Sequence, residues 1–451
     1  MTNIYIAADT GPSGFGVASR GLIRQLVEEK DINLNVRTHF WGWNKKGFIF
    51  KGGKSFPDSR FREYLFRNNL VNEEYLIDDV REASKRDNVE LTKDLKDNRR
   101  VDSEELMIKQ FPTGEKEDVW LGIGGQNFAE HTPQDEDIHT ILSTDFNLDL
   151  VPRKWEHYLD KVDEVWVPSK WVKKAIKKRF RDYRQDIVDK TYIMPYGINM
   201  NYEPTEYDCE ACPDQHGRGY RGGACLRDDK FTFLVISRFY HIKGVYRTIK
   251  AFIEEFRGDE PVRLFFKTTS NQQFQFDPMK SVKAVINELG YPDPPEIGMK
   301  VKPFTTNYLY DLMGQSDCFL QLSRAECFGI AQLQAAYCGT PVIYTNWSAQ
   351  KEVMDENNKG LIPVNDFELE RPRPESQAFM YAGSNDFPPD SRWATPSVEA
   401  IGKKMREVFE MSKEERNKRG QEAREYVKNN FKWEDKIKDR VKSIKEGDNN
   451  E

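Results

Sequence analysis

Two stretches of the sequence decide the fold: Phe-Thr-Phe-Leu-Val-Ile-Ser-Arg-Phe-Tyr-His-Ile-Lys-Gly at 231–244, and Ser-Arg-Ala-Glu-Cys-Phe-Gly-Ile-Ala-Gln-Leu-Gln at 323–334. Each pattern predicts a buried strand, a short loop and the start of a helix. Such a loop offers backbone N–H groups and the positive end of a helix dipole to an anion. Arg238 and Lys243 add two cations, and Glu326 adds a carboxylate at the predicted helix start. The two loops therefore predict a diphosphate site with a carboxylate beside it. Each loop taken alone has a structural explanation, as a surface cation or a helix-terminal charge, but two such loops in successive units favour binding.

Strands and helices alternate around these loops. This alternation predicts parallel sheets with helices on both faces, and ligands in such sheets bind outside the carboxyl ends of the strands. A similar opening unit, with a strand at Ile4–Ala8 and a glycine-rich turn, begins the chain. In the second half, strands are predicted at Phe231–Ser237, Val262–Thr269, Ile297–Val301, Cys318–Ser323 and Pro341–Thr345.

The length of 451 residues is too great for one hydrophobic core and predicts two domains. We place an N-terminal Rossmann-like domain at 1–196, with a charged insertion at about 45–118. A C-terminal Rossmann-like domain follows at 197–430, with a cysteine-rich insertion at about 205–228. The last segment, 431–451, is expected to be a helix that packs back on the N-terminal domain.

The overall charge gives no reason to expect binding to nucleic acid or to a membrane. The formal net charge is −6, and the sequence shows neither a signal peptide nor an apolar run long enough to span a bilayer. We therefore expect a cytoplasmic protein. One local exception is the basic helix at 171–184, whose apolar stripe is Val172, Ala175, Ile176 and Phe180. Its outward lysines are expected to be a solvated face. The alternative is contact with an anionic acceptor, either a lipid headgroup, as in a peripheral membrane protein, or a nucleic-acid backbone.

The pattern Arg238-x4-Lys243-Gly244, followed by Glu326-Cys-Phe-Gly-Ile-x3-Gln334, resembles the C-terminal domain of the glycosyltransferase family 4 enzymes. Val165-Trp-Val-Pro-Ser and Met194-Pro-Tyr-Gly-Ile-Asn resemble that family's N-domain strand and interdomain linker. The resemblance implies the GT-B architecture, in which two Rossmann-like doubly wound domains face each other across a cleft. It also implies a retaining, metal-independent transfer of a hexose or pentose from a nucleotide-diphosphate sugar, the donor.

The resemblance assigns roles by position. Arg238 and Lys243 would hold the donor diphosphate, together with the backbone amides of Phe328, Gly329 and Ile330 and the glycine-rich turn of Gly14, Phe15 and Gly16. Glu326 would contact hydroxyls of the transferred sugar and would not act as a base. Gln334 stands where the family usually has a second glutamate for the ribose hydroxyls. Because glutamine lacks the charge, nucleotide binding is expected to be weaker or altered. The loops at Lys267 and at Pro303–Phe304 should flank the base and show no clear preference for one.

The implied mechanism is internal return, in which the leaving phosphate accepts the proton of the acceptor hydroxyl and no enzymic nucleophile is needed. The N-terminal domain would place a polar residue near the anomeric carbon. Asp145 leads the candidates, ahead of Asn127 and His131, although a capping role explains Asp145 equally well. Asp145 and Glu326 are thus the candidate catalytic residues. The acceptor is left open among glycans, lipids, proteins and modified nucleic acids, and the aromatic-rich insertion is where its specificity would be sought.

Four potential zinc ligands, Cys209, Cys212, His216 and Cys225, lie in a polar segment that has no apolar core of its own. A structural zinc is one interpretation; a disulfide or free thiols are the alternatives. Cys318, Cys327 and Cys338 are expected to be small core residues.

Two other functions stay open at this stage. One is an epimerase or a phosphorylase-like enzyme of the same fold, although no site for a lysine-bound cofactor is evident. The other is a non-catalytic scaffold that binds a nucleotide or a carbohydrate, an alternative that the glutamine at position 334 keeps open. Turnover of a sugar donor would separate these from a transferase.

Overall fold

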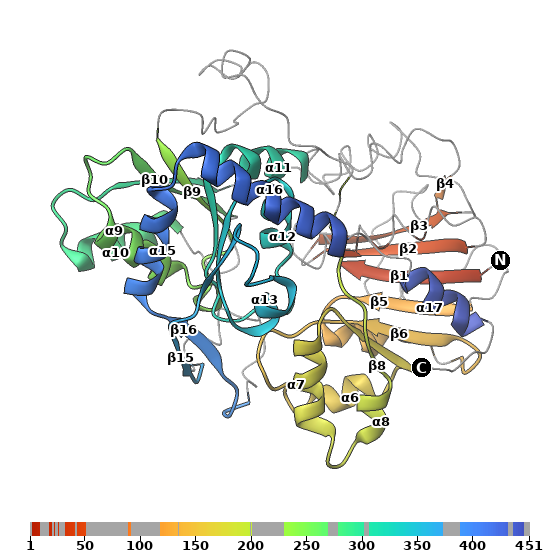
Figure 1. Cartoon of the computed structure of the whole chain (residues 1–451). Helices are drawn as coiled ribbons and strands as arrows, with labels where there is room; N and C mark the ends of the chain where they lie inside the picture. Colours follow the sequence, from red (N-terminus) through yellow and green to blue (C-terminus); the bar gives the residue numbers. More distant parts are fainter. Residues whose placement is uncertain are drawn as a thin grey trace. The chain divides into compact units, whose positions relative to one another are not determined.

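The computed structural model describes residues 2–9, 18–19, 22, 26, 32–40, 43–50, 89–91, 118–133, 135–198, 200, 230–268, 278–301, 306–372, 388–431 and 436–445. The chain separates into two compact units. The first contains Met1–Phe146, Val151–Asn199 and Trp433–Glu451, and the second contains Asn147–Leu150 and Met200–Lys432. Each unit is built on its own largely parallel sheet (Figure 1).

The sheet of the first unit has the strand order β4-β3-β2-β1-β5-β6-β7-β8. Strands β2, β1 and β5 to β8 are parallel, whereas β3 and β4 pair antiparallel at one edge. The charged insertion expected at about 45–118 therefore begins inside β3, and its described residues extend the sheet. The strands are β1 (Thr2–Asp9), β2 (Ile32–Phe40), β3 (Trp43–Phe50), β4 (Val89–Leu91), β5 (Val119–Ile123), β6 (His139–Ser143), β7 (Glu164–Val167) and β8 (Thr191–Ile193).

Short helices connect these strands: η1 (Gln126–His131), α6 (Trp155–Leu159), α7 (Lys170–Phe180) and α8 (Gln185–Asp189). The apolar stripe predicted for α7 is confirmed, because Val172, Ala175, Ile176 and Phe180 are all buried. The prediction that this helix reaches residue 184 is wrong. It ends at Phe180, and Arg184 instead forms ion pairs with Glu156, Asp160 and Asp186. None of the helices in the described ranges is long and apolar enough to span a bilayer.

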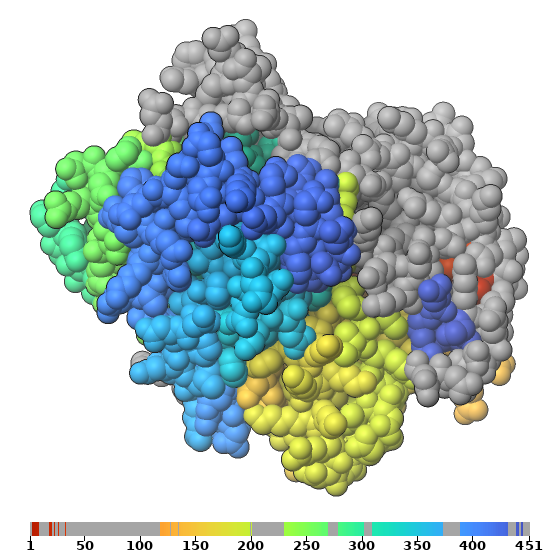
Figure 2. Space-filling view, in the orientation of Figure 1, coloured from red at the N-terminus to blue at the C-terminus, as the bar shows by residue number. Residues whose placement is uncertain are grey.

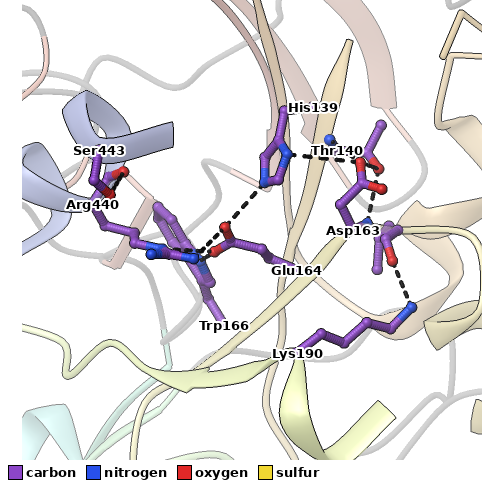
Figure 3. A network of polar contacts seen from close by, with 9 residues as sticks. His139, Thr140, Asp163, Glu164, Trp166, Lys190, Arg440 and Ser443 are labelled. Carbon is purple, nitrogen blue, oxygen red and sulfur yellow. Dashed lines mark hydrogen bonds and ion pairs between the residues drawn. The ribbon is translucent and has the colours of Figure 1, made fainter. Parts of the chain in front are cut away.

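A buried carboxylate connects the last described helix, α17 (Lys436–Lys445), to the sheet of the first unit (Figure 3). Glu164 of β7 is 4% exposed and accepts hydrogen bonds from Trp166 Nε1 at 2.8 Å and from Arg440 Nη2 and Nε at 2.8 and 3.2 Å. His139 Nε2 lies 3.0 Å from the same carboxylate. The Arg440 guanidinium also lies 4.3 Å from the centre of the Tyr192 ring. Burial alone would raise the pKa of Glu164, but the hydrogen bonds from His139, Arg440 and Trp166 hold it below its ordinary value.

The sheet of the second unit has the strand order β11-β10-β9-β12-β13-β14, and all of its pairs are parallel. Each of the five strands predicted here is confirmed to within two residues at each end. The strands are β9 (Phe231–Ile236), β10 (Val262–Thr268), β11 (Glu296–Val301), β12 (Cys318–Gln321), β13 (Val342–Thr345) and β14 (Leu361–Val364). A separate antiparallel pair follows, β15 (Phe367–Glu370) and β16 (Trp393–Pro396).

Helices cover both faces of this sheet. One face carries a continuous apolar core in which α9 (Val245–Glu255), α10 (Pro278–Leu289) and α15 (Val398–Phe409) pack on alternate residues of the strands. The other helices are α11 (Thr306–Gln315), α12 (Ile330–Tyr337), α13 (Ser348–Val353) and α16 (Lys413–Asn430). Helix α16 packs on α12 and lies on the outside of this unit (Figure 2). The predicted doubly wound α/β fold is thereby confirmed for this unit.

Candidate functional site

The candidate site lies where the strand order of the second unit reverses direction. From β9 the chain moves outward through β10 to β11, whereas β12 lies on the other side of β9 and leads through β13 to β14. The loops after β9 and β12 therefore leave neighbouring strand ends in different directions. Such a switch point is the usual ligand site in open α/β sheets. It brings together the two stretches that the sequence predicted as a phosphate site.

Direct contact between the two loops explains Gly244, which has a positive φ of 66°. A Cβ atom at this position would lie 2.1 Å from the backbone oxygen of Leu322, so a side chain has no room. Next to it, the N–H of Arg324 donates to the backbone oxygen of Ile242 at 2.7 Å. The two loops are thus in direct contact, and glycine is needed both for the backbone conformation and for the close approach.

Arg238 lies two residues after the end of β9 and is exposed. Its contacts are with Tyr240, whose hydroxyl lies 3.3 Å from Nη1 and whose ring centre lies 6.0 Å from the guanidinium carbon. Within the described ranges no carboxylate forms an ion pair with Arg238. The guanidinium can therefore make a forked contact with an incoming phosphate without first breaking a salt bridge.

Lys243 and Glu326, 83 positions apart in sequence, form an ion pair across the two loops. Lys243 Nζ lies 2.5 Å from Glu326 Oε1, and Glu326 is 5% exposed. Gln321 Nε2 donates to the same oxygen at 3.0 Å. The backbone N–H of Glu326 donates to Ser348 Oγ at 2.9 Å, and its backbone oxygen accepts from the N–H of Ala349 at 3.2 Å. The carboxylate is therefore fixed in place, with the lysine that was expected to bind phosphate directly against it.

The expectation that Glu326 starts a helix is wrong. Helix α12 begins at Ile330, after Gly329 in the left-handed conformation with φ 92°. The preceding residues stay in a loop because their backbone groups bond elsewhere: besides the contacts of Glu326, the N–H of Cys327 donates to Asn147 Oδ1 at 3.0 Å. The amides of the first helical turn have no acceptor within the helix. Phe328 to Ile330 thus lie at the N-terminus of α12, and their contact with an anion stays a prediction.

Gln334 lies one turn into α12 and is 5% exposed. Its side-chain nitrogen is 3.5 Å from the hydroxyl of Tyr310 on α11, which is a weak hydrogen bond at most. The amide is therefore held loosely against a neutral aromatic residue. A carboxylate at this position would meet the same buried hydroxyl.

Lys267 is the penultimate residue of β10 and is 7% exposed. Its backbone oxygen accepts from the N–H of Ser237 at 3.1 Å, so the ends of β9 and β10 lie at the same level. Burial, and secondly the charge of Arg238, lower the pKa of Lys267 to about 8. A third cation thus lies at this edge of the sheet.

Other predicted residues lie elsewhere. Asp145 follows β6 in the first unit, two residues beyond the strand, and His131 ends η1 of that unit, which also contains Asn127. The turn at Gly14, Phe15 and Gly16 and the cysteine cluster at Cys209, Cys212, His216 and Cys225 lie outside the described residues. Among those described, no group of His, Cys, Asp and Glu side chains forms a metal site. Cys318 and Cys338 are buried as expected, and burial raises the pKa of both thiols, whereas Cys327 is only partly buried.

Two contributors to the site were not predicted. Gln321 orients the Glu326 carboxylate, and Ser348, the first residue of α13, fixes its backbone. A polar Gln321 inside the apolar run Cys-Phe-Leu-Gln-Leu was a visible signal. Ser348 gave none, because its role depends on a positive φ of 58° and on the distance between two loops.

Comparisons with known proteins support this fold. A family model described as "Glycosyl transferases group 1" matches residues 294–368, which include Glu326, the start of α12 and Gln334. A search of the curated proteins found no match. Among solved structures, the Anabaena protein HepE in complex with UDP and glucose has a TM-score of 0.59 at 13% identity, covering 98% of this chain and 100% of that one. The chain has the GT-B fold.

Two further GT-B structures support the assignment of the fold. A glycosyltransferase from Rickettsia africae has a TM-score of 0.57 at 15% identity and covers 100% of this chain and 99% of that one. The sucrose-phosphate synthase of Thermosynechococcus elongatus has a TM-score of 0.57 at 14% identity and covers 99% and 100%. At these identities the likeness establishes the GT-B fold, and the matched segment adds the sequence pattern of a group 1 glycosyltransferase domain.

Proposed function

We propose that this protein is a retaining glycosyltransferase that transfers a sugar from a nucleotide-diphosphate donor to a hydroxyl group of an acceptor. The observation that carries the proposal is the joining of the loops after β9 and β12, which puts Lys243 against the Glu326 carboxylate, with Arg238 earlier in the first loop and the N-terminus of α12 directly after the second. The Anabaena structure of the same fold holds UDP and glucose. We assign the same class of ligand to this site.

The cations would act on the leaving group. As the bond between the anomeric carbon and the phosphate oxygen breaks, negative charge grows on the diphosphate, and Arg238 and Lys243 stabilise it. The leaving phosphate oxygen takes the proton of the acceptor hydroxyl, while the acceptor oxygen forms the new bond to the same face of the sugar. These side chains supply the positive charge, so the proposed transfer needs no metal ion.

Glu326 would bind the sugar rather than take part in proton transfer. Its Oε1 is already occupied by Lys243 and Gln321, so the other oxygen is the one offered to sugar hydroxyls. Because Lys243 contacts Glu326, it can bridge the sugar-binding carboxylate and the phosphate. The lysine would thereby couple recognition of the sugar to stabilisation of the leaving group.

Alanine variants of Arg238 and Lys243 test this proposal, with transfer or donor hydrolysis as the measurement. Each is expected to lower kcat/KM by about a hundredfold or more, since each removes a charged contact that strengthens in the transition state. Lys250→Ala is the matched control, because Lys250 lies on α9 and, among the described residues, its ion pair is with Glu254 of the same helix. Activity that survives both substitutions at the control's level would contradict the proposal.

The second candidate is a scaffold that binds a nucleotide or a carbohydrate without turnover. The loosely held Gln334 is the observation that favours it. Release of free nucleotide from a nucleotide sugar separates the two: a transferase releases nucleoside diphosphate, and a scaffold that binds the same compound does not.

A further inference from the structure

Lys267 is a buried lysine at the ligand-binding edge of the second sheet. In β10 its neighbours Val262, Leu264 and Phe266 point into the apolar core, so the alternation of side chains puts Lys267 on the opposite face. It is the penultimate residue of its strand and lies at the level of Ser237, immediately before Arg238. The ammonium group therefore belongs to the carboxyl edge of the sheet, on the strand next to β9.

This position is electrostatically unfavourable in the ligand-free protein. Only 7% of the residue is exposed, so the ammonium group has lost most of its water, and the nearby Arg238 guanidinium repels it. Both effects lower the pKa of Lys267, to about 8, which still leaves the amine mostly charged at neutral pH. A leucine or methionine would fit a buried strand end at less cost. Two neighbouring cations at the carboxyl ends of adjacent strands become favourable together when an anion with several charges binds between them.

We propose that Lys267 is a third cation of the donor site and holds a phosphate oxygen of the nucleotide diphosphate beside Arg238. The inference rests on the proposed function, and it adds a residue that the motif of Arg238, Lys243 and Glu326 does not contain. Lysine suits this role because its compact charge binds phosphate as a point charge on a stem that packs against apolar neighbours.

Lys267→Met distinguishes binding from a structural role, because methionine keeps the packing of the stem and removes the charge. If Lys267 binds phosphate, the variant melts at a higher temperature than the wild type without ligand and binds the diphosphate more weakly. If the lysine is structural, the variant melts at a lower temperature and binds unchanged. Lys267→Gln, neutral and polar, provides the same test if the methionine variant does not fold.

Lys300→Met is the matched control. Lys300 pairs with Lys267 in the parallel register of β10 and β11, so it lies at the same level of the sheet, one strand further from Arg238. Removal of its charge should leave diphosphate binding unchanged. A general effect of net charge on anion binding would weaken binding in both variants equally.

The experiment is titration calorimetry at pH 7 with inorganic pyrophosphate and with UDP, ADP and GDP, on the full chain. Loss of one charged contact should weaken binding in Lys267→Met by about tenfold or more, with Lys300→Met at the wild-type value. Weakening in Arg238→Ala but not in Lys267→Met would overturn this inference and leave the proposed function standing. A wild-type protein that binds none of these compounds would overturn the proposed function, and this inference with it.

Discussion

The ion pair between Glu164 and Arg440 should account for much of the stability with which α17 is held to the first unit. We consider the substitution Glu164→Gln, which keeps the size of the side chain and removes the charge. Glu164 presents two oxygens, and each faces two ring or guanidinium nitrogens. The oxygen Oε2 faces Trp166 Nε1 and Arg440 Nε, which can only donate hydrogen bonds. The glutamine must therefore point its oxygen at Trp166 Nε1 and Arg440 Nε, and its NH2 group at His139 and Arg440 Nη2.

The expected cost follows from this geometry. His139 can accept from the new NH2 group in one of its tautomers, but Arg440 Nη2 loses its acceptor, and the guanidinium, 11% exposed, loses its counter-charge. Removal of one partner from a buried pair costs about 3–5 kcal/mol. Because three of the four contacts can be kept, we expect about 3 kcal/mol, the lower end of that range.

Hydrogen exchange of residues 436–445, followed by mass spectrometry, measures the opening of α17 separately from the rest of the chain. A loss of about 3 kcal/mol corresponds to exchange that is roughly a hundredfold faster in this segment. Arg440→Met should have a similar effect, and the double variant should fall short of the sum by about 2 kcal/mol. The control Glu399→Gln, which breaks the exposed pair with Lys403, should produce no measurable change.

Two results would refute this reasoning: unchanged exchange of α17 in Glu164→Gln, or effects of the two substitutions that simply add. The pH gives an independent check. Since the folded protein holds the pKa of Glu164 below its ordinary value of 4.5, its contribution is present above that pH and is lost as the pH falls through the lowered value. The difference between wild type and Glu164→Gln should therefore shrink in acid.

Three further predictions concern the second unit. Gly244→Ala should destabilise it by about 3 kcal/mol or more in denaturant unfolding. The control Gly290→Ala has the same sign of φ but no atom within 4 Å of the new Cβ, so it should cost only about 1 kcal/mol. Equal costs would show that the contact with Leu322 does not add to the destabilisation. The pKa of Lys267 is lowered to about 8 from 10.5, so between these pH values the unfolded chain binds one proton more than the folded protein. The free energy of unfolding of the ligand-free wild type should therefore rise by up to about 3 kcal/mol from pH 8 to 10.5, and that of Lys267→Met should not. Parallel pH curves for the two proteins would contradict this prediction. Gln334→Glu should tighten binding of a ribonucleoside diphosphate by about tenfold, because the added carboxylate accepts hydrogen bonds from the ribose hydroxyls. Binding of pyrophosphate, which has no ribose, should be unchanged. Titration calorimetry with both ligands measures the two affinities.

Much of the fold was predictable from local patterns. The apolar runs at β9, β10 and β12 have the length and composition of buried strands, and the residues after them have the turn chemistry of loops. The local sequence is therefore enough to place Arg238 and Lys243 in the segment that follows a strand. The exact start of α12 could not be predicted, because it depends on contacts of Glu326 and Cys327 with the segments around Ser348 and Asn147.

The sequence by itself determined the elements of this protein and the kinds of residue at their ends, because the period of apolar residues and the demands of turns act over a few positions. Only the tertiary structure decided which ends meet. Lys243 contacts Glu326 because β9 and β12 are neighbours in the sheet, and Arg440 contacts Glu164 across 276 positions because α17 packs on the first unit. The burial of Lys267 beside Arg238 likewise follows from strand order. Strand order and helix packing are set by burial of the whole core, which no local pattern records.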